Sequence, residues 1–314
     1  MCNKRPLTKD EDLEWLGIRW QPTMRCNFNC PFCLQHQYKH HDDKIEQQIL
    51  NNSLDEIDKA FSYGKLKWWK IIGGEFTILP LSIRDRILDI AKKYDPYLYL
   101  TTNGSNLKWL DPFTNGTHGE LLISLHDTET DIFKIIENGK AFAEKHPNFF
   151  VKYAIVAKDN LDTVIKAHEI LGDLLIVQAC REEYTNKISD EYKNSPEYKW
   201  IVEHNYGNSY NNRLYSSERT DEFECIMRGI VIDYNGRIRL CNRNNENYTI
   251  EEAIKALPKK VYCKIQACTK CNGQIFKNIY TERSAFDKLL SIKKAKMSGA
   301  KMSEAKMSEA KGGK

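Results

Sequence analysis

Three cysteines lie within one short loop and form the densest group of potential metal ligands in this sequence. They are Cys26, Cys30 and Cys33, spaced C-x3-C-x2-C. Thiolates are the protein ligands of iron–sulfur clusters, and a four-iron cube bound by only three of them keeps one iron open for a small molecule. An open position distinguishes a catalytic metal site from a closed structural one. Three histidines follow between residues 36 and 41, so a zinc site is the alternative.

This loop resembles the hallmark of the radical S-adenosylmethionine (SAM) superfamily, C-x3-C-x-aromatic-C, with Phe32 in the aromatic position. In that family the open iron of a 4Fe–4S cluster chelates the amino and carboxylate groups of SAM. The resemblance implies that Phe32 lies near the adenine. It also implies an electron donor, such as flavodoxin or ferredoxin, that reduces the cluster.

A Gly-Gly-Glu sequence made of Gly73, Gly74 and Glu75 ends the second predicted strand, 40 residues after the cysteine loop. Two glycines allow the backbone to approach a ligand without a clash at Cβ, and the carboxylate can accept a hydrogen bond from an ammonium group. The sequence resembles the family motif that contacts the amino group of SAM. A plain turn is the alternative.

Polar residues also end the third and fourth predicted strands. Thr102 and Asn103 at one, and Ser124 at the other, resemble family positions that line the ribose and carboxylate of SAM. His126 and Asp127 follow and are candidates for a general acid or base that faces the substrate. The alternative is that Asp127 caps a helix and His126 is exposed to solvent.

A second group of cysteines lies near the C-terminus. Its members are Cys225, Cys241, Cys268 and Cys271. We expect a hairpin to bring Cys225 near Cys241, and Cys268-x2-Cys271 adds a second pair, so a four-ligand site can close around iron or zinc. The pattern C-x10-G-x4-C resembles the SPASM and Twitch extensions of radical SAM enzymes. The further cysteines of SPASM are absent, so one auxiliary 4Fe–4S cluster, as in Twitch, is the better interpretation, with Cys263 as a possible alternative ligand.

Alternating strand-like and helix-like segments must position these residues. The predicted strands are 18–23, 68–72, 97–101, 121–125, 149–156 and 174–177, and the predicted helices between them are 45–61, 83–91, 132–142 and 160–170. Repeated units of this kind predict an α/β fold with a parallel sheet, either a partial barrel or a doubly wound sheet. Both bind ligands at the C-terminal ends of their strands. The resemblance implies a partial (β/α)6 TIM-type barrel.

The pattern further divides the chain into segments. They are an N-terminal lead-in over 1–14, the barrel core over 15–180, a polar connector over 181–224 with a short helix at 198–203, a small auxiliary cluster domain over 225–275, a C-terminal helix over 276–292 and a basic low-complexity tail over 293–314. The auxiliary domain is expected to contain a hairpin over 229–240, turning at Asn-Gly, and a helix over 250–257.

Composition restricts the functional class. The net charge of the 314 residues is +4, but the tail holds seven Lys and two Glu, so the remaining chain carries −1. There is thus no strong signal for a nucleic-acid partner. The polar N-terminus lacks a signal peptide and no apolar run is long enough to span a membrane, which predicts a cytoplasmic location. In a reducing cytosol, clustered cysteines bind metal more often than they form disulfides.

Two enzymatic hypotheses and one other follow from these motifs. The first is radical modification of a peptide or protein side chain, because relatives with auxiliary clusters often act in this way. The second is radical oxidation or rearrangement of a small molecule, such as a sugar, a nucleotide or a cofactor precursor. The third is a non-enzymatic scaffold or sensor, against which Gly73-Gly74-Glu75 argues, since a scaffold does not need it.

Overall fold

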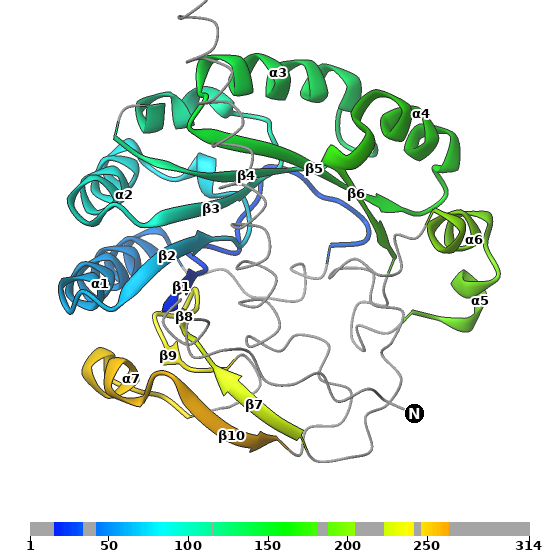
Figure 1. The fold of residues 1–314 in the computed structure, drawn as a ribbon. Helices are drawn as coiled ribbons and strands as arrows, with labels where there is room; N and C mark the ends of the chain where they lie inside the picture. The colour runs from blue at the N-terminus through cyan, green and yellow to red at the C-terminus, as the bar shows by residue number, and fades with distance from the viewer. Residues whose placement is uncertain are drawn as a thin grey trace, which may run out of the picture.

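The computed structural model describes residues 16–33, 42–114, 116–180, 188–204, 223–241 and 246–263 (Figure 1). Six strands follow one another through the first part of the chain, as predicted. They are β1 (Leu16–Trp20), β2 (Leu66–Ile71), β3 (Tyr97–Thr102), β4 (His118–Leu125), β5 (Phe149–Ala157) and β6 (Leu175–Ala179). The predicted helix over 276–292, the lead-in and the basic tail lie outside the described residues.

The six strands form one parallel sheet whose spatial order is the chain order, from β1 to β6. The helices that connect them are α1 (Asp43–Ser62), α2 (Leu81–Tyr94), α3 (Ile132–Lys145) and α4 (Leu161–Leu171). All four cover the convex side of the curved sheet (Figure 1). A doubly wound sheet would carry helices on both faces, so the structure selects the partial open barrel.

The predicted Asn-Gly hairpin is present, but it belongs to the barrel sheet. It consists of β8 (Gly229–Ile232) and β9 (Ile238–Arg239), and β8 pairs in parallel with β1. All four residues of β8 are buried, because this apolar strand covers the edge that β1 would otherwise expose. A separate antiparallel pair, not predicted from the sequence, is made by β7 (Phe223–Met227) and β10 (Lys259–Cys263).

Two short helices lie in the connector, where one was predicted. They are α5 (Asp190–Lys193) and α6 (Pro196–Glu203). The second begins before the predicted residue 198, because Ser195 accepts a hydrogen bond from the backbone of Tyr198 and Pro196 occupies the first turn. The predicted helix near residue 250 is α7 (Ile250–Ala256), which starts with a capping box between Thr249 and Glu252.

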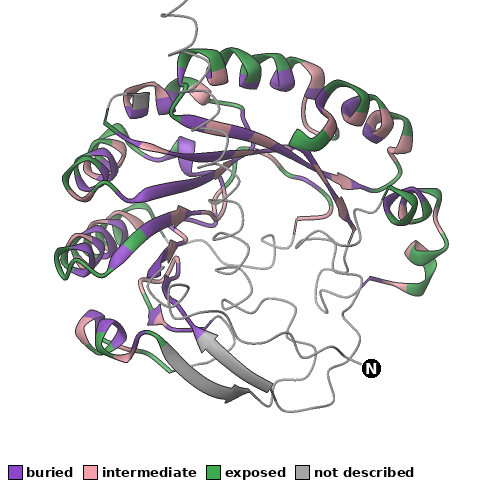
Figure 2. Ribbon diagram, in the orientation of Figure 1, coloured by how far each residue is buried: buried purple, intermediate pink, exposed green. Residues whose placement is uncertain are grey.

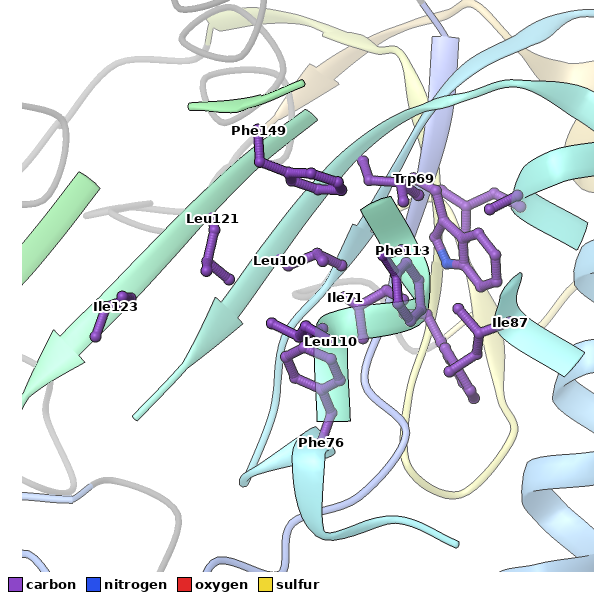
Figure 3. Packing of buried hydrophobic residues seen from close by; sticks show 14 of the residues in the cluster. Trp69, Ile71, Phe76, Ile87, Leu100, Leu110, Phe113, Leu121, Ile123 and Phe149 are labelled. Atoms are coloured by element: carbon purple, nitrogen blue, oxygen red, sulfur yellow. The ribbon is translucent and has the colours of Figure 1, made fainter. Parts of the chain in front are cut away.

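The apolar core lies between the sheet and the helices, which turn their buried faces inward (Figure 2). Close packing is seen where Trp69 and Ile71 of β2 meet Phe113 and Leu110 of η3 (Leu107–Thr114) (Figure 3). Trp69 and Phe113 are fully buried. Burial of each such side chain contributes roughly 1.5–3 kcal/mol, so this layer stabilises the packing of η3 on the sheet. Two further 3-10 turns are η2 (Phe76–Ile78) and η4 (Gly172–Leu174).

The opposite face of the sheet carries charged side chains among aromatic ones. The register places Arg19 beside Lys70, Lys70 beside Tyr99, and Tyr99 beside Glu120. Lys152 Nζ lies 3.0 Å from a carboxylate oxygen of Glu120 in a largely buried ion pair. Because side chains alternate along a strand, the same strands point apolar side chains toward the helices and charged ones into the barrel. Among the described helices, none combines the length and the apolarity needed to cross a membrane.

Candidate cluster and SAM site

The cysteine loop begins where β1 ends, and the segment after β2 holds its first residues. The backbone N–H of Gly74 donates to the carbonyl of Thr23 at 2.8 Å, and that of Glu75 donates to the carbonyl of Arg25 at 2.7 Å. These bonds continue the pairing of β1 with β2 beyond the last residue of each strand. The Gly-Gly-Glu sequence therefore fixes the position at which the chain enters the loop.

Both glycines are required by this backbone contact. A Cβ at Gly74 would lie 1.9 Å from the carbonyl oxygen of Arg25, and one at Gly73 would lie 2.5 Å from that of Thr23. The sequence predicted a close approach of these glycines to a ligand, and the structure places the chain's own backbone at that distance. The two glycines are therefore needed so that the backbone of the cysteine loop can pack against this segment.

A second anchor joins the loop to the first turn of α1. Glu46 accepts a hydrogen bond from the hydroxyl of Thr23 at 2.5 Å and pairs with Nε of Arg25 at 2.8 Å. Arg25 also pairs with Asp43 at 2.5 Å. The sequence analysis missed these residues, and their only signal is the acidic first turn of a helix close to a basic residue.

The three cysteines occupy different depths. Cys30 is 4% exposed, Cys33 is half-buried and Cys26 is exposed. Burial raises the pKa of the Cys30 thiol to about 12. The backbone N–H of Cys33 donates to the carbonyl of Cys30 at 3.0 Å, and that of Phe28 donates to Sγ of Cys26 at 3.4 Å. These two hydrogen bonds fold the short loop that carries the three thiols.

The donor set of this loop is three thiols, and its chemistry fits an iron–sulfur cluster. His36, His40 and His41, which the zinc alternative would need, lie outside the described residues. In a cubane each thiolate binds a different iron, so the sulfurs stay apart. The residues that would hold such a cluster are Cys26, Cys30 and Cys33.

Glu75 connects the end of β2 to the end of β3. One carboxylate oxygen accepts hydrogen bonds from the backbone and hydroxyl of Thr77 at 3.0 and 2.7 Å and from the hydroxyl of Thr102 at 2.8 Å. The other accepts from the backbone of Asn103 at 2.6 Å. Burial raises the pKa of Glu75, and these donors oppose the rise. Glu75 is 1% exposed and its carboxylate meets these protein donors. Its contact with the ammonium group of SAM stays a prediction.

Asn103 connects the end of β3 to the cysteine loop. Its amide nitrogen donates to the side-chain oxygen of Asn27 at 2.9 Å and lies 3.7 Å from Sγ of Cys26. Asn27 in turn donates to the hydroxyl of Ser105 at 3.0 Å. The side chains of Thr102 and Asn103 are therefore held by the protein at the site where we expected SAM contacts. Asn27 and Ser105 were missed because their contact joins loops 78 residues apart.

His126 contacts the cysteine loop from the end of β4. Its Nδ1 lies 3.2 Å from Sγ of Cys30, and burial lowers the pKa of its ring. The ring of Phe32 stacks on it at a centroid distance of 5.9 Å. The alternative in which His126 is exposed is wrong, since it is half-buried. Ser124, two residues earlier, is half-buried on the inner face of β4.

Asp127 does not cap the following helix. The N-cap residue of α3 is Asp131, so the capping alternative for Asp127 is wrong. The Asp127 carboxylate instead accepts a hydrogen bond from the side chain of Asn160 at 2.7 Å. This bond ties the loop after β4 to the loop after β5.

The C-terminal cysteines are only partly described. Cys225 lies on β7, where the register places it opposite Val261, and Cys263 ends β10 opposite Phe223. Cys241 is buried and lies two residues after the end of β9. Cys225 precedes the hairpin of β8 and β9 and Cys241 follows it, so the two cysteines flank the hairpin. Their closeness in space stays a prediction. Cys268 and Cys271 lie outside the described residues.

Taken together, a partial α/β barrel carries a three-thiol loop after β1 and polar clamps at the ends of β2, β3 and β4. This is the arrangement of an enzyme that binds a cofactor at the C-terminal edge of its barrel. Residues 20–175 match the family model of the radical SAM superfamily. That stretch includes the cysteine loop and all three strand-end clamps, and it is therefore a radical SAM domain.

Solved structures with a similar fold include SuiB from Streptococcus suis bound to SAM, with 16% identity, 77% of this chain and 65% of that chain covered, and a TM-score of 0.48. The chain thus spans about two thirds of SuiB. For anSMEcpe with bound AdoMet and the Kp18Cys peptide, the identity is 16%, the match covers 76% of this chain and 79% of that chain, and the TM-score is 0.48. For HemN, the coproporphyrinogen III oxidase of Escherichia coli, the identity is 14%, the match covers 63% of this chain and 54% of that chain, and the TM-score is 0.42. Comparison with curated protein sequences finds no match.

Proposed function

We propose that this chain binds a 4Fe–4S cluster through Cys26, Cys30 and Cys33, cleaves SAM reductively there and uses the resulting radical on a peptide or protein side chain. The observation that carries the proposal is the contact of the three-thiol loop with the ends of β2, β3 and β4 inside a radical SAM domain. The radical SAM mechanism follows from the family, and the substrate is the proposed part.

Once reduced by an external donor, such a cluster would supply one electron for the reductive cleavage of SAM to methionine and a 5′-deoxyadenosyl radical, which would take a hydrogen atom from the substrate. The chain's own residues would hold the cluster loop and orient SAM. Gly73 and Gly74 let the backbone hold the loop, and Glu75 holds the ends of β2 and β3 together. The proposed contacts of SAM are Phe32, Gly73, Gly74, Glu75, Thr102, Asn103 and Ser124. The electron comes from an external donor such as flavodoxin or ferredoxin.

A peptide or protein substrate is proposed because relatives that carry an auxiliary cluster often modify peptides. We propose that Cys225, Cys241, Cys268 and Cys271 hold one auxiliary 4Fe–4S cluster, which would accept an electron from the substrate radical and make the reaction a net oxidation. Cys241 is buried beside the barrel sheet, which suits a ligand that must be shielded from water. The polar connector over 181–224 offers hydrogen-bonding groups to a peptide backbone.

A small-molecule substrate is the second candidate. It is favoured by the cysteine count, because the chain fits the pattern of one auxiliary cluster and lacks the further cysteines of the SPASM pattern. Twitch enzymes, which this pattern resembles, act on small molecules. The reaction would then be an oxidation or rearrangement of a sugar, a nucleotide or a cofactor precursor.

Anaerobic reconstitution tests the proposal. With SAM and dithionite, the iron-loaded protein should release 5′-deoxyadenosine, and the Cys26→Ala/Cys30→Ala/Cys33→Ala variant should not. Cys2→Ala, which lies outside every motif, is the matched cysteine control and should retain the activity. If the triple variant released as much 5′-deoxyadenosine as wild type, the proposed cluster site would be wrong.

Deuterium transfer separates the two substrate classes. A deuterated substrate passes its label to 5′-deoxyadenosine, which mass spectrometry detects. We expect transfer from peptides encoded beside the gene and none from sugars or nucleotides. The opposite result would favour the small-molecule function.

A further inference from the structure

His126 makes a polar contact with Cys30, one of the proposed cluster ligands, and the proposed function assigns this contact no chemical role. Its Nδ1 lies 3.2 Å from Sγ of Cys30, within the limit for a hydrogen bond to sulfur. The two residues are 96 positions apart, and they meet because β4 ends beside the cysteine loop. Cys30 is the most deeply buried of the three thiols, so water competes little for its sulfur.

Two aromatic rings from the cysteine loop set the orientation of His126. Phe32 stacks on it with 13° between the ring planes, and Phe28 meets it edge-on at 81°, with a centroid distance of 5.8 Å. One ring restrains the imidazole on its face and the other at its edge. The imidazole is therefore held in the plane that brings Nδ1 to the sulfur.

The direction of the hydrogen bond follows from the chemistry of the ligand. A cysteine that binds iron is a thiolate and carries no S–H. The contact then satisfies both atoms only when the proton is on Nδ1 and the sulfur accepts it. A hydrogen bond to a ligand sulfur withdraws negative charge, which favours the reduced, more negative state of an iron–sulfur cluster.

The geometry points to His126 as a positioning residue that donates an Nδ1–H hydrogen bond to the Cys30 thiolate and thereby raises the reduction potential of the SAM-cleaving cluster. This inference rests on the proposed cluster site. It differs from the role expected from the sequence, in which His126 exchanges a proton with the substrate. By donating its Nδ1–H to the sulfur of Cys30, His126 would make the cluster easier to reduce before SAM is cleaved.

Two variants separate the hydrogen bond from the ring. His126→Phe keeps an aromatic ring for Phe32 and Phe28 and removes the donor. His126→Asn removes the ring and keeps an amide nitrogen near the position of Nδ1. His118→Asn, at the other end of β4, is the matched control.

The readout is the midpoint potential of the cluster in the full chain, from an anaerobic redox titration followed by electron paramagnetic resonance without SAM. The relevant signal is the one that is lost in the Cys26→Ala/Cys30→Ala/Cys33→Ala variant. We expect a more negative potential in His126→Phe, with the ratio of reduced to oxidised cluster at fixed potential falling up to tenfold, about 59 mV for one electron. His126→Asn and His118→Asn should stay close to wild type.

Two results would overturn the inference while leaving the proposed function intact. One is a His126→Phe protein with full iron content and an unchanged potential. The other is an equal shift in His126→Phe and His126→Asn, which would indicate ring packing. A wild-type protein without any cluster signal would instead contradict the proposed function itself.

A measurement on wild type covers the case in which the variants lose the cluster. In protein labelled with 15N-histidine, pulsed electron paramagnetic resonance of the reduced cluster should detect a nitrogen coupled across the hydrogen bond. Absence of any histidine coupling to the signal assigned to this cluster would refute the inference.

Discussion

The backbone N–H of Asn103 donates a 2.6 Å hydrogen bond to the carboxylate of Glu75, although the two residues are 28 positions apart. This bond joins the ends of β2 and β3, and the side chain of the same Asn103 lies 3.7 Å from Sγ of Cys26. It makes Glu75 part of the framework of the site. The framework is rigid because the remaining oxygen of Glu75 is bound to Thr77 and Thr102.

We predict that Glu75→Gln destabilises the protein and weakens SAM binding. A backbone N–H points at each carboxylate oxygen, from Thr77 at one and from Asn103 at the other. The amide nitrogen of glutamine would face one of these donors in either orientation, and a buried donor without an acceptor costs about 1–3 kcal/mol.

Chemical unfolding and calorimetric titration with SAM measure the two effects. Glu144→Gln, on the exposed face of α3, is the matched control and should behave as wild type. Unchanged unfolding and SAM affinity in Glu75→Gln would contradict this account of the strand clamp.

We predict that Gly74→Ala displaces the cysteine loop. The added Cβ would lie 1.9 Å from the carbonyl oxygen of Arg25, so the 2.7 Å bond from Glu75 to that carbonyl cannot persist. Overpacking of this kind typically costs about 1–3 kcal/mol. Iron content after reconstitution should fall together with stability.

Gly64→Ala is the control for Gly74→Ala. No atom lies within 4 Å of its Cβ, but its φ of +71° disfavours alanine. It should lose about 1–2 kcal/mol of stability through backbone strain and bind a full complement of iron. Equal iron content in the two variants would show that the glycine contact does not position the loop.

We predict that Cys30 is the slowest of the three loop cysteines to react with iodoacetamide in protein without iron. The thiolate is the reactive form, and burial both raises the pKa of Cys30 to about 12 and blocks access to its sulfur. Cys26 is exposed and should be modified before Cys30. Peptide mass spectrometry at pH 8 gives the order, and modification of Cys30 before Cys26 would contradict it.

We predict that His146 contributes to loss of stability in acid. Its side chain is fully buried and stacks on Phe142 at a centroid distance of 4.0 Å, and burial lowers its pKa from the ordinary value of 6.5. Below pH 6.5 the unfolded chain therefore binds a proton that the folded chain does not, so the free energy of unfolding falls as the pH falls.

Urea unfolding at pH 7 and pH 5 measures this effect. The loss between the two pH values should be smaller in His146→Leu than in wild type, whatever the stability of the variant at pH 7. Equal losses in the two proteins would show that His146 does not titrate on unfolding.

Local patterns in the sequence determined most of the barrel. Apolar residues at strand and helix spacing predicted β1 to β6 and the helices between them, because these periods come from backbone geometry. The C-x3-C-x2-C spacing also predicted the cluster loop locally, since its three cysteines lie within a few residues of one another. Asn235-Gly236 predicted the hairpin of β8 and β9 from turn chemistry alone.

Only the tertiary structure decided which residues meet across the barrel edge. The contacts of Glu75 with Asn103, of Asn27 with Ser105, and of His126 with Cys30 join separate loops. The pairing of β8 with β1 also depends on how the curved sheet leaves one edge open. Such contacts depend on the register and curvature of a whole sheet, which no spacing within one segment records.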